Sequence, residues 1–385
     1  MDQQGVRRPA KGPPGAVADD VSASTDEARR GRSHAGSGGR ARTVADAAAA
    51  RRRAERRAER IGAGVEELEQ RLADLLRSGL ATADRPGYAF WEETAARMVD
   101  AQAPGLAGRV RELGAIPGSG PDWPGRLLEE CALAHLLGRA WHRVGALPEP
   151  LAVTVRTRMG LPASPGGPPV RDRWSVLARY DRTDGRLATR RTWLYGQGSG
   201  RTALLLSYGA GGRPLGAALP VGAVLDAELT AYPGAGQLRA ELGERFGDPA
   251  PGACPPPGGT VADALAAYGA ALREDPWLES WPGTLAAVVP LPDGGGGWQL
   301  AEADGTAAVP VTAAAVGRQG LWRLAAVSGG RPITVFGECG HRGFTPLAAW
   351  TTAAGPPGET AAHPAAVSGP GSGPGGAPPP LVALI

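Results

Sequence analysis

The chain has 385 residues and a formal net charge of +3, and it contains 59 glycines and 37 prolines. This share of glycine and proline favours structureless tracts, so a single compact domain from end to end is not expected. Three cysteines in a chain of this length exclude a disulfide scaffold, and the sequence has no run of about 18 apolar residues that would indicate a membrane protein.

The basic charge is concentrated near the N-terminus. Residues 1–60 carry 14 basic and 8 acidic side chains, while acidic side chains slightly outnumber basic ones in the rest of the chain. A basic arm can bind nucleic acid by counterion release, whereas the alternative is a solvated tail followed by an Arg/Glu helix. The first 20 residues lack the apolar core of a secretory signal, so a reducing cytoplasm is the expected compartment.

Both ends of the chain have the composition of disordered segments. Residues 1–43 are rich in Gly, Ser, Pro, Asp and Arg and have almost no large apolar side chains, which predicts a disordered basic arm. Residues 353–385 form a low-complexity Gly/Pro tail. The last five residues, Leu381 to Ile385, are apolar and are compatible with a short strand that docks back on the body.

Residues 44–160 are predicted to form a helical domain. The segment RRRAERRAER, at 51–60, places Arg and Glu three and four residues apart, as on an exposed helix. An apolar face follows at helical spacing, formed by Ile61, Val65, Leu68, Leu72, Leu75 and Leu76. Further helices are expected over 88–101, 106–113, 124–144 and 150–159. In the helix 124–144 the side chains expected to point inward are Leu127, Leu128, Cys131, Leu133, His135, Leu136 and Trp141.

Strand-like runs separated by Gly and Asp turns occupy 161–352 and predict a mostly antiparallel β-rich region. The expected strands lie at 174–182, 186–196, 201–208, 284–291, 298–304, 307–311, 321–328, 332–339 and 343–350. Residues 221–232 are interpreted as a strand pair or one bent strand, and 261–273 as an amphipathic helix. The expected fold class is therefore α+β, with an N-terminal helical domain followed by a β region that contains one or two helices.

No motif in the sequence indicates a cofactor or a phosphate site. The segment GQGSG, at 196–200, resembles a phosphate-binding loop, but a strand and not a helix follows it, so a hairpin turn is predicted. The single lysine, Lys11, lies in the basic arm, which excludes a P-loop lysine.

Two Cys–His pairs supply the candidate metal ligands. Cys131 and His135 lie four residues apart on one predicted helix, and Cys339 and His341 lie two residues apart near a hairpin end. Together they have the composition of a Cys2His2 zinc site, and a Cys–His pair is also the basis of nucleophilic catalysis. A small apolar Cys and a satisfied core His explain the helical pair without a metal. We therefore predict no catalytic, cofactor-binding or metal-binding residue and no stoichiometric zinc.

The ten tryptophans stand out against four phenylalanines and six tyrosines. In a core otherwise made of Ala, Val and Leu, tryptophan supplies the volume. The alternative is a stacking surface for single-stranded nucleic acid, with Arg173 beside Trp174 and with Arg190 and Arg191 near Trp193.

Several segments resemble the C-terminal region of actinobacterial SWIM zinc finger family proteins. They are residues 85–113, 123–140, 170–177, 189–208, 220–240 and 321–338, and the resemblance runs from about residue 50 to about residue 350. The finger of that family, C-x-C followed by C-x-H, binds zinc. This sequence has no C-x-C, and Cys339-Gly340-His341 copies only the C-x-H half, so no family metal ligand maps onto the chain. Either the gene start has lost the finger or this is a finger-less relative.

The resemblance implies an accessory role, because SWIM family members are often found alongside MoxR-type AAA ATPases and von Willebrand A-domain proteins. The leading hypothesis is a non-enzymatic, cytoplasmic interaction protein with such a protein partner and no membrane partner. One alternative is a nucleic-acid-binding protein that uses the basic arm and the Arg/Trp surface, with weak and non-specific binding. The other alternative is an enzyme whose site is not recognised in the sequence.

Overall fold

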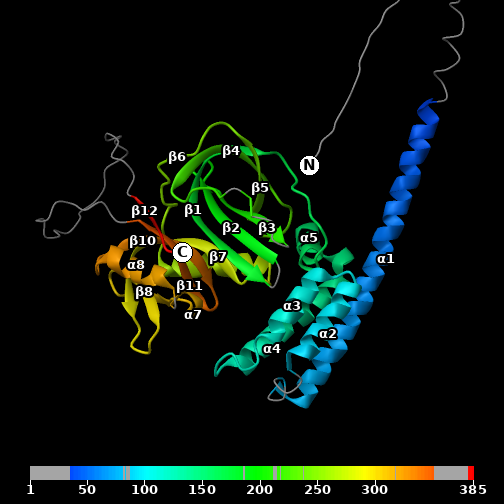
Figure 1. Ribbon diagram of the computed structural model, residues 1–385, viewed down its shortest axis with the longest axis horizontal. Coiled ribbons are helices and arrows are strands. Elements are labelled where there is room, and N and C mark those ends of the chain that lie inside the picture. The colour runs from blue at the N-terminus through cyan, green and yellow to red at the C-terminus, as the bar shows by residue number, and fades with distance from the viewer. Residues whose placement is uncertain are drawn as a thin grey trace, which may run out of the picture. The chain divides into compact units, whose positions relative to one another are not determined.

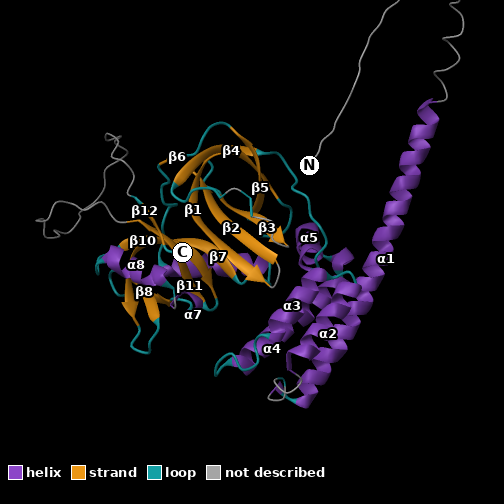
Figure 2. Cartoon of the chain, viewed as in Figure 1, coloured by secondary structure: helices purple, strands orange, loops and turns teal. Residues whose placement is uncertain are grey.

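Helices form the first part of the described chain, and strands form most of the rest (Figures 1 and 2). The computed structural model describes residues 35–80, 83, 87–184, 187–210, 215–216, 218–236, 238–316, 318–350 and 380–385. The α+β class predicted from the sequence is confirmed. The chain divides into two compact units, Met1–Arg60 and Ile61–Ile385. The second unit contains helices and both sheets, so the domain boundary at 160/161 stays a prediction.

The first five helices follow the predicted order. They are α1 (Ala35–Ser78), α2 (Gly87–Asp100), α3 (Pro104–Gly114), α4 (Trp123–His142) and α5 (Glu149–Arg158), with a 3-10 turn at Val144–Ala146. Helix α1 begins at Ala35, nine residues before the predicted start of the helical domain, and residues 1–34 lie outside the described residues. The earlier start is explained by propagation, since each residue added to an established Ala- and Arg-rich helix gains a backbone hydrogen bond.

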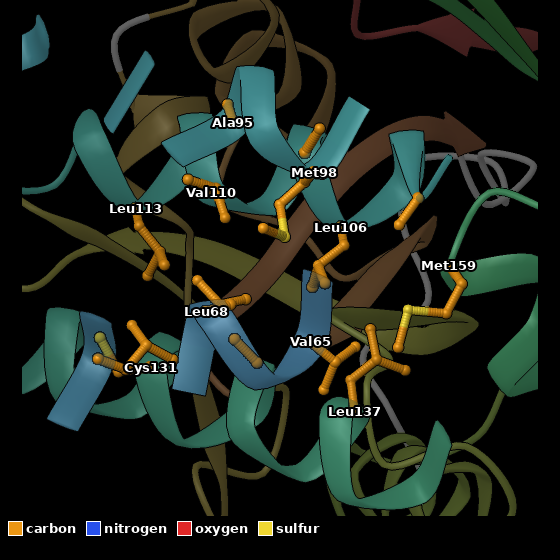
Figure 3. Close-up of a cluster of buried hydrophobic side chains, with 14 of the residues drawn as sticks. Val65, Leu68, Ala95, Met98, Leu106, Val110, Leu113, Cys131, Leu137 and Met159 are labelled. Carbon is orange, nitrogen blue, oxygen red and sulfur yellow. The ribbon is translucent and has the colours of Figure 1, made fainter. Parts of the chain in front are cut away.

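The helices of the second unit share one apolar core, part of which is drawn in Figure 3. Its buried members include Ile61, Val65, Leu68, Met98, Leu106, Val110, Leu113, Leu127, Leu137 and Val155. Trp277, which belongs to the segment before the second sheet, is also in this core, and its Nε1 donates a 3.0 Å hydrogen bond to the carbonyl of Leu133. The helical bundle is therefore packed against the β-rich part of the same unit.

Helix α4 turns a different face inward than the one predicted. Leu127, Cys131 and Trp141 are buried as expected, together with Ala134 and Leu137. In contrast, Leu128 and Leu136 are 48% and 42% exposed, and His135 is also exposed. Neighbouring residues on a helix point about 100° apart, so Leu127 and Leu128 do not share one buried face.

The first sheet is a closed barrel. Its strands are β1 (Val170–Asp184), β2 (Leu187–Gly196), β3 (Thr202–Ala210), β4 (Ala223–Ala231), β5 (Arg239–Arg245) and β6 (Ala250–Pro251). The order β1-β2-β3-β5-β4 closes because β1 also pairs with β4, and β3 pairs with β5 in parallel. A register shift between Val176 and Ala178 bends β1, which lets it pair with both neighbours. This strand order is that of the OB-fold, a five-stranded Greek-key barrel.

The second sheet is antiparallel and carries helices on one face. Its order is β12-β11-β10-β7-β8-β9, formed by β7 (Ser280–Pro292), β8 (Trp298–Glu302), β9 (Ala308–Pro310), β10 (Ile333–Gly340), β11 (Gly343–Trp350) and β12 (Leu381–Ala383). Val335 of β10 packs in one core with the helices α6 (Val261–Glu274), α7 (Ala313–Val316) and α8 (Gln319–Ser328). The next residue, Phe336, packs in another core with Trp193 of the barrel. The sheet therefore lies between these helices and the barrel.

Three local predictions in the β-rich region were wrong or too coarse. Residues 321–328, expected as a strand, form α8, because Leu321, Leu324 and Ser328 are buried at helical spacing. The described part of the region holds three helices instead of one or two, and β4 is a single strand. The short strand at the end of the chain is confirmed as β12, while the segment 351–379 lies outside the described residues.

Candidate functional site: an arginine-lined cavity

A cavity of about 570 Å³ lies where the barrel, helix α8 and the last residues of the chain meet. It is lined by Arg179, Tyr180, Asp181, Arg190, Arg318, Gln319, Gly320, Leu384 and Ile385. Strands β1 and β2 supply the first four of these, the residue before α8 and its first turn supply the next three, and the segment after β12 supplies the last two. Segments far apart in the sequence therefore build this site.

Three arginines and one aspartate set the charge of the cavity. Arg190 forms a two-point ion pair with Asp181, at 2.9 Å in both hydrogen bonds, and Arg179 donates to the carbonyl of Leu219 at 2.9 Å. Arg318 is exposed, and its side chain has no hydrogen bond or ion pair within the described part of the chain. The excess of positive charge favours an anionic ligand, since guanidinium groups pair well with carboxylates and phosphates.

The ionisable groups of the cavity are not tuned for proton transfer near neutral pH. The hydrogen bond from Arg190 holds the pKa of the Asp181 carboxyl below its usual value. Burial, followed by the nearby Glu338 carboxylate, raises the pKa of Tyr180 to about 12. A general acid or base works best with a pKa close to the operating pH, and the pKa values of Asp181 and Tyr180 are both shifted away from neutral pH.

A buried carboxylate lies behind the cavity, between the barrel and the second sheet. Glu338 of β10 is 5% exposed and accepts hydrogen bonds from the Tyr180 hydroxyl at 2.6 Å, from Trp193 Nε1 at 2.8 Å and from the Ser280 hydroxyl at 3.0 Å. The Arg191 guanidinium lies 3.9 Å from the Glu338 carboxylate and forms an ion pair with it. Glu338 is thus occupied by internal donors, and it holds the two sheets together.

The structure does not bring the four candidate metal ligands together. Cys131 lies in the bundle core, where Figure 3 shows it among apolar side chains, and Cys339 lies in the separate core under α6 and α8. His135 contacts Glu69 at 2.5 Å. His341 contacts Glu129 at 3.1 Å and the Tyr268 hydroxyl at 3.3 Å. Among the described residues, no three His, Cys, Asp or Glu side chains form a group that would hold a metal ion.

The two buried thiols are expected to be inert. Burial raises the pKa of Cys131 to about 11 and also raises the pKa of Cys339, whereas Cys254 is partly exposed. The thiolate is the reactive form, so at pH 8 a thiol reagent should modify Cys254 quickly and the other two only after denaturation. A titration that counts modified thiols in the native and the denatured chain measures this. Rapid modification of all three in the native chain would contradict the burial of Cys131 and Cys339.

The segment GQGSG is a hairpin turn, as predicted, and its backbone already binds an anion from within the chain. The Asp172 carboxylate accepts from the backbone N–H groups of Gly198 at 3.0 Å and of Ser199 at 2.7 Å. Although burial raises the pKa of Asp172, these bonds and those from the Ser199 hydroxyl and the Arg173 N–H lower it on balance. The N–H groups of Gly198 and Ser199 are therefore bonded to Asp172 and are not available to bind a phosphate.

The named positions support the prediction that tryptophan supplies core volume, and they do not support the alternative of an Arg/Trp stacking surface. Trp174 and Trp193 are 2% and 3% exposed, and each indole N–H bonds inside the protein, so both serve as core volume. The exposed tryptophan is instead Trp322 on α8, at 67%, which contacts Trp298 edge to face with ring centroids 5.5 Å apart. Successive β-strand residues point to opposite sides, which separates Arg173 from Trp174. Arg191 does lie over the Trp193 ring, 5.9 Å from its centroid, but that ring is buried.

The arginines of the cavity carry no signal in the sequence. Arg179 and Arg190 lie on two neighbouring strands, and Arg318 follows more than a hundred residues later, with no motif around any of them. Only the tertiary structure, which brings Arg318 and the first turn of α8 to the same cavity as β1 and β2, makes them one site.

Comparison with known proteins gives one match. Residues 56–159 match the family model of the SWIM-associated four-helix bundle domain, and this range runs from within α1 to the end of α5. No match is found among the curated proteins or among the solved structures. Within the described residues, no helix combines the length and the apolar character needed to cross a bilayer. Residues 56–159 are therefore a SWIM-associated four-helix bundle domain, and the match confirms the resemblance to SWIM proteins over this part of the chain.

Proposed function

We propose that this protein is a non-enzymatic accessory protein that binds other proteins, and that its partner is a MoxR-type AAA ATPase or a von Willebrand A-domain protein. The relationship to SWIM proteins supports the accessory role, since such proteins accompany that class of ATPase. The observation that carries the proposal is the edge of the second sheet, where β11 takes up the three-residue strand β12 from a distant part of the sequence. Addition of an extended segment to a sheet edge is a general mode of protein recognition.

The chemistry of the cavity also favours binding over catalysis. Its acid–base groups, Asp181 and Tyr180, have pKa values displaced away from neutrality, and the buried Glu338 next to it is saturated by donors. An enzyme would need a group poised to exchange a proton or attack a substrate. The arginines offer recognition of negative charge instead.

The partner can be tested directly. The full chain and a MoxR-type AAA ATPase from the same genome are purified and mixed in a sedimentation-velocity experiment with ATP. A complex that sediments faster than either protein is expected, with a change in the ATP hydrolysis rate. Two independent boundaries and an unchanged rate, for this ATPase and for a von Willebrand A-domain protein of the same genome, would refute the proposed partners.

Nucleic-acid binding is the second candidate, and the barrel gives a specific reason to consider it. OB-fold barrels bind oligonucleotides on the face of strands β2 and β3. Here that face is covered, because Trp193 and Leu204 pack against Phe336, Leu347 and Trp350 of the second sheet. The usual ligand face of such a barrel is thus used for an internal contact.

Binding of DNA or RNA is accordingly expected to be weak, independent of sequence and steeply dependent on salt, because only phosphate neutralisation contributes. Deleting residues 1–60, which carry 14 basic and 8 acidic side chains, should remove most of it, whereas Arg173→Gln on the barrel should not. Fluorescence anisotropy with a labelled oligonucleotide at two salt concentrations measures this. A salt-insensitive, sequence-selective complex that survives the deletion would favour nucleic acid as the true ligand.

A further inference from the structure

The strand β12 sits in a groove between the edge of β11 and helix α8. Leu381, Val382 and Ala383 pair with residues 348–350 of β11 in antiparallel register. The next residue continues the ladder, since the N–H of Leu384 donates to the carbonyl of Leu347 at 3.0 Å. From the other side, Arg323 of α8 donates to the carbonyl of Ala383 at 2.8 Å. The groove thus binds four consecutive residues of an extended segment largely through their backbone.

Leu384 is the side chain that anchors the segment. It is 2% exposed and belongs to the apolar core shared by the second sheet and helices α6 to α8. Helix α8 makes room for its backbone at Gly320, where a β-carbon would lie 1.5 Å from the Leu384 carbonyl oxygen. Only glycine fits at this position, so the first turn of α8 is shaped for an extended backbone to pass.

The arginine-lined cavity begins where the anchor ends. Leu384 and Ile385 form part of its wall, and Arg179, Arg190 and Arg318 face it with Asp181 as the one acidic side chain. Ile385 is apolar and 39% exposed, so the chain's own segment leaves the positive charge of the cavity unmatched by its side chains. A segment with carboxylate side chains after the anchoring leucine would complement the charge of these arginines.

We propose that this groove is a docking site for an extended segment of a partner protein, in which an apolar anchor at the place of Leu384 is followed by acidic residues. The chain's own residues 381–385 occupy the groove in the absence of the partner and compete with it. This inference rests on the proposed function, and it specifies the surface and the chemistry by which the partner is recognised.

Competition follows from the small extent of β12. Three paired residues and one anchoring side chain hold β12 in the groove. A segment of 29 residues lies between Trp350, at the end of β11, and Pro380, which precedes β12. A partner segment that makes the same backbone bonds and adds ion pairs with Arg318 replaces it. The apparent affinity for the partner is lowered by the fraction of molecules whose groove is already filled, so removal of β12 should strengthen binding.

The test uses labelled peptides and fluorescence anisotropy. One peptide has the sequence of residues 380–384 followed by two glutamates, and its matched control ends in two lysines. A chain shortened to end at residue 379 should bind the acidic peptide about tenfold tighter than the lysine peptide, and about tenfold tighter than the full chain does. Replacing the anchoring leucine of the peptide by aspartate should abolish binding. In the shortened chain, Arg318→Glu should remove the preference for the acidic peptide.

Each contrary result is informative. Equal binding of both peptides would refute the acidic partner, and equal binding by the full and shortened chains would refute competition. A full chain that sediments as a dimer, and becomes a monomer when residues 380–385 are removed, would identify a second copy as the occupant instead. Should the shortened chain not fold, hydrogen exchange of the full chain decides. Excess acidic peptide should then speed exchange of the Leu384 amide, and no acceleration at saturation would overturn the proposal.

The site and the proposed function can fail separately. If the peptides bind as expected but no complex forms with the ATPase or the von Willebrand A-domain protein, the docking groove is supported and the named partners are refuted. If the ATPase forms a complex that the acidic peptide does not disrupt, and if the shortened chain forms the same complex, the proposed function is supported and the contact lies elsewhere on the protein.

Discussion

Replacing Glu338 by leucine is expected to lower the free energy of unfolding by about 3–5 kcal/mol, because removing one member of a buried polar cluster leaves its partners unsatisfied. The three donors left behind would be the Tyr180 hydroxyl, Trp193 Nε1 and the Ser280 hydroxyl, all within 3.0 Å of the carboxylate. Glu338→Gln keeps one carbonyl acceptor and should cost less. Urea unfolding followed by circular dichroism measures the difference.

The matched control is Glu241→Leu on β5, which is exposed and should change stability by no more than about 0.5 kcal/mol. Tyr180→Phe and Ser280→Ala each remove a single neutral donor, and each should cost only about 1 kcal/mol. If Glu338→Leu were as mild as these variants, Glu338 would not be the residue that holds the barrel to the second sheet.

Replacing Asp275 by alanine is expected to destabilise the protein by about 3–5 kcal/mol, because it breaks a buried ion pair and leaves the Arg158 guanidinium without its carboxylate partner. Asp275 is 1% exposed and accepts two hydrogen bonds from Arg158 of α5, at 3.1 and 2.5 Å. It also accepts from the N–H of Trp277, whose ring lies in the bundle core. Thermal unfolding followed by calorimetry should show the loss as a lower midpoint.

The same variant tests whether the bundle and the β-rich part unfold together. Arg158 and Trp277 join the two parts of the second unit, so weakening this contact should broaden or split a single transition. Asp248→Ala, an exposed aspartate after β5, is the control and should leave one unchanged transition. An unaltered single transition in Asp275→Ala would mean that other contacts couple the bundle to the sheets.

The fold class was readable from the sequence because hydrophobic periodicity is a local property. The spacing of Ile61, Val65 and Leu68 predicts a helix whatever the helix packs against, and the Gly and Asp turns between apolar runs predict strands. Errors occurred where local signals are ambiguous. The run 321–328 is short and apolar, and periodicity alone does not distinguish a buried strand from a buried helix at that length.

The candidate site was not readable from the sequence, for a different reason. Arg179, Arg190 and Arg318 are ordinary arginines in an arginine-rich chain, and they line one cavity only because the tertiary structure brings the start of α8 close to β1 and β2. The four residues that the sequence did single out, Cys131, His135, Cys339 and His341, have spacings compatible with a zinc site. In the structure the two cysteines lie in different cores, and the two histidines contact different glutamates. Spacing along the chain therefore does not by itself bring side chains together on one metal.

The sequence by itself determined the α+β class, the order of the main helices and most strands, the hairpin at GQGSG and the relationship to SWIM proteins, because these follow from periodicity, turn chemistry and local likeness. Only the tertiary structure decided that five strands close into a barrel, that the second sheet covers one face of β2 and β3, and that β12 fills a groove beside an arginine-lined cavity. These features depend on contacts between residues tens to hundreds of positions apart. No local pattern encodes such contacts, since they arise when whole faces are buried together.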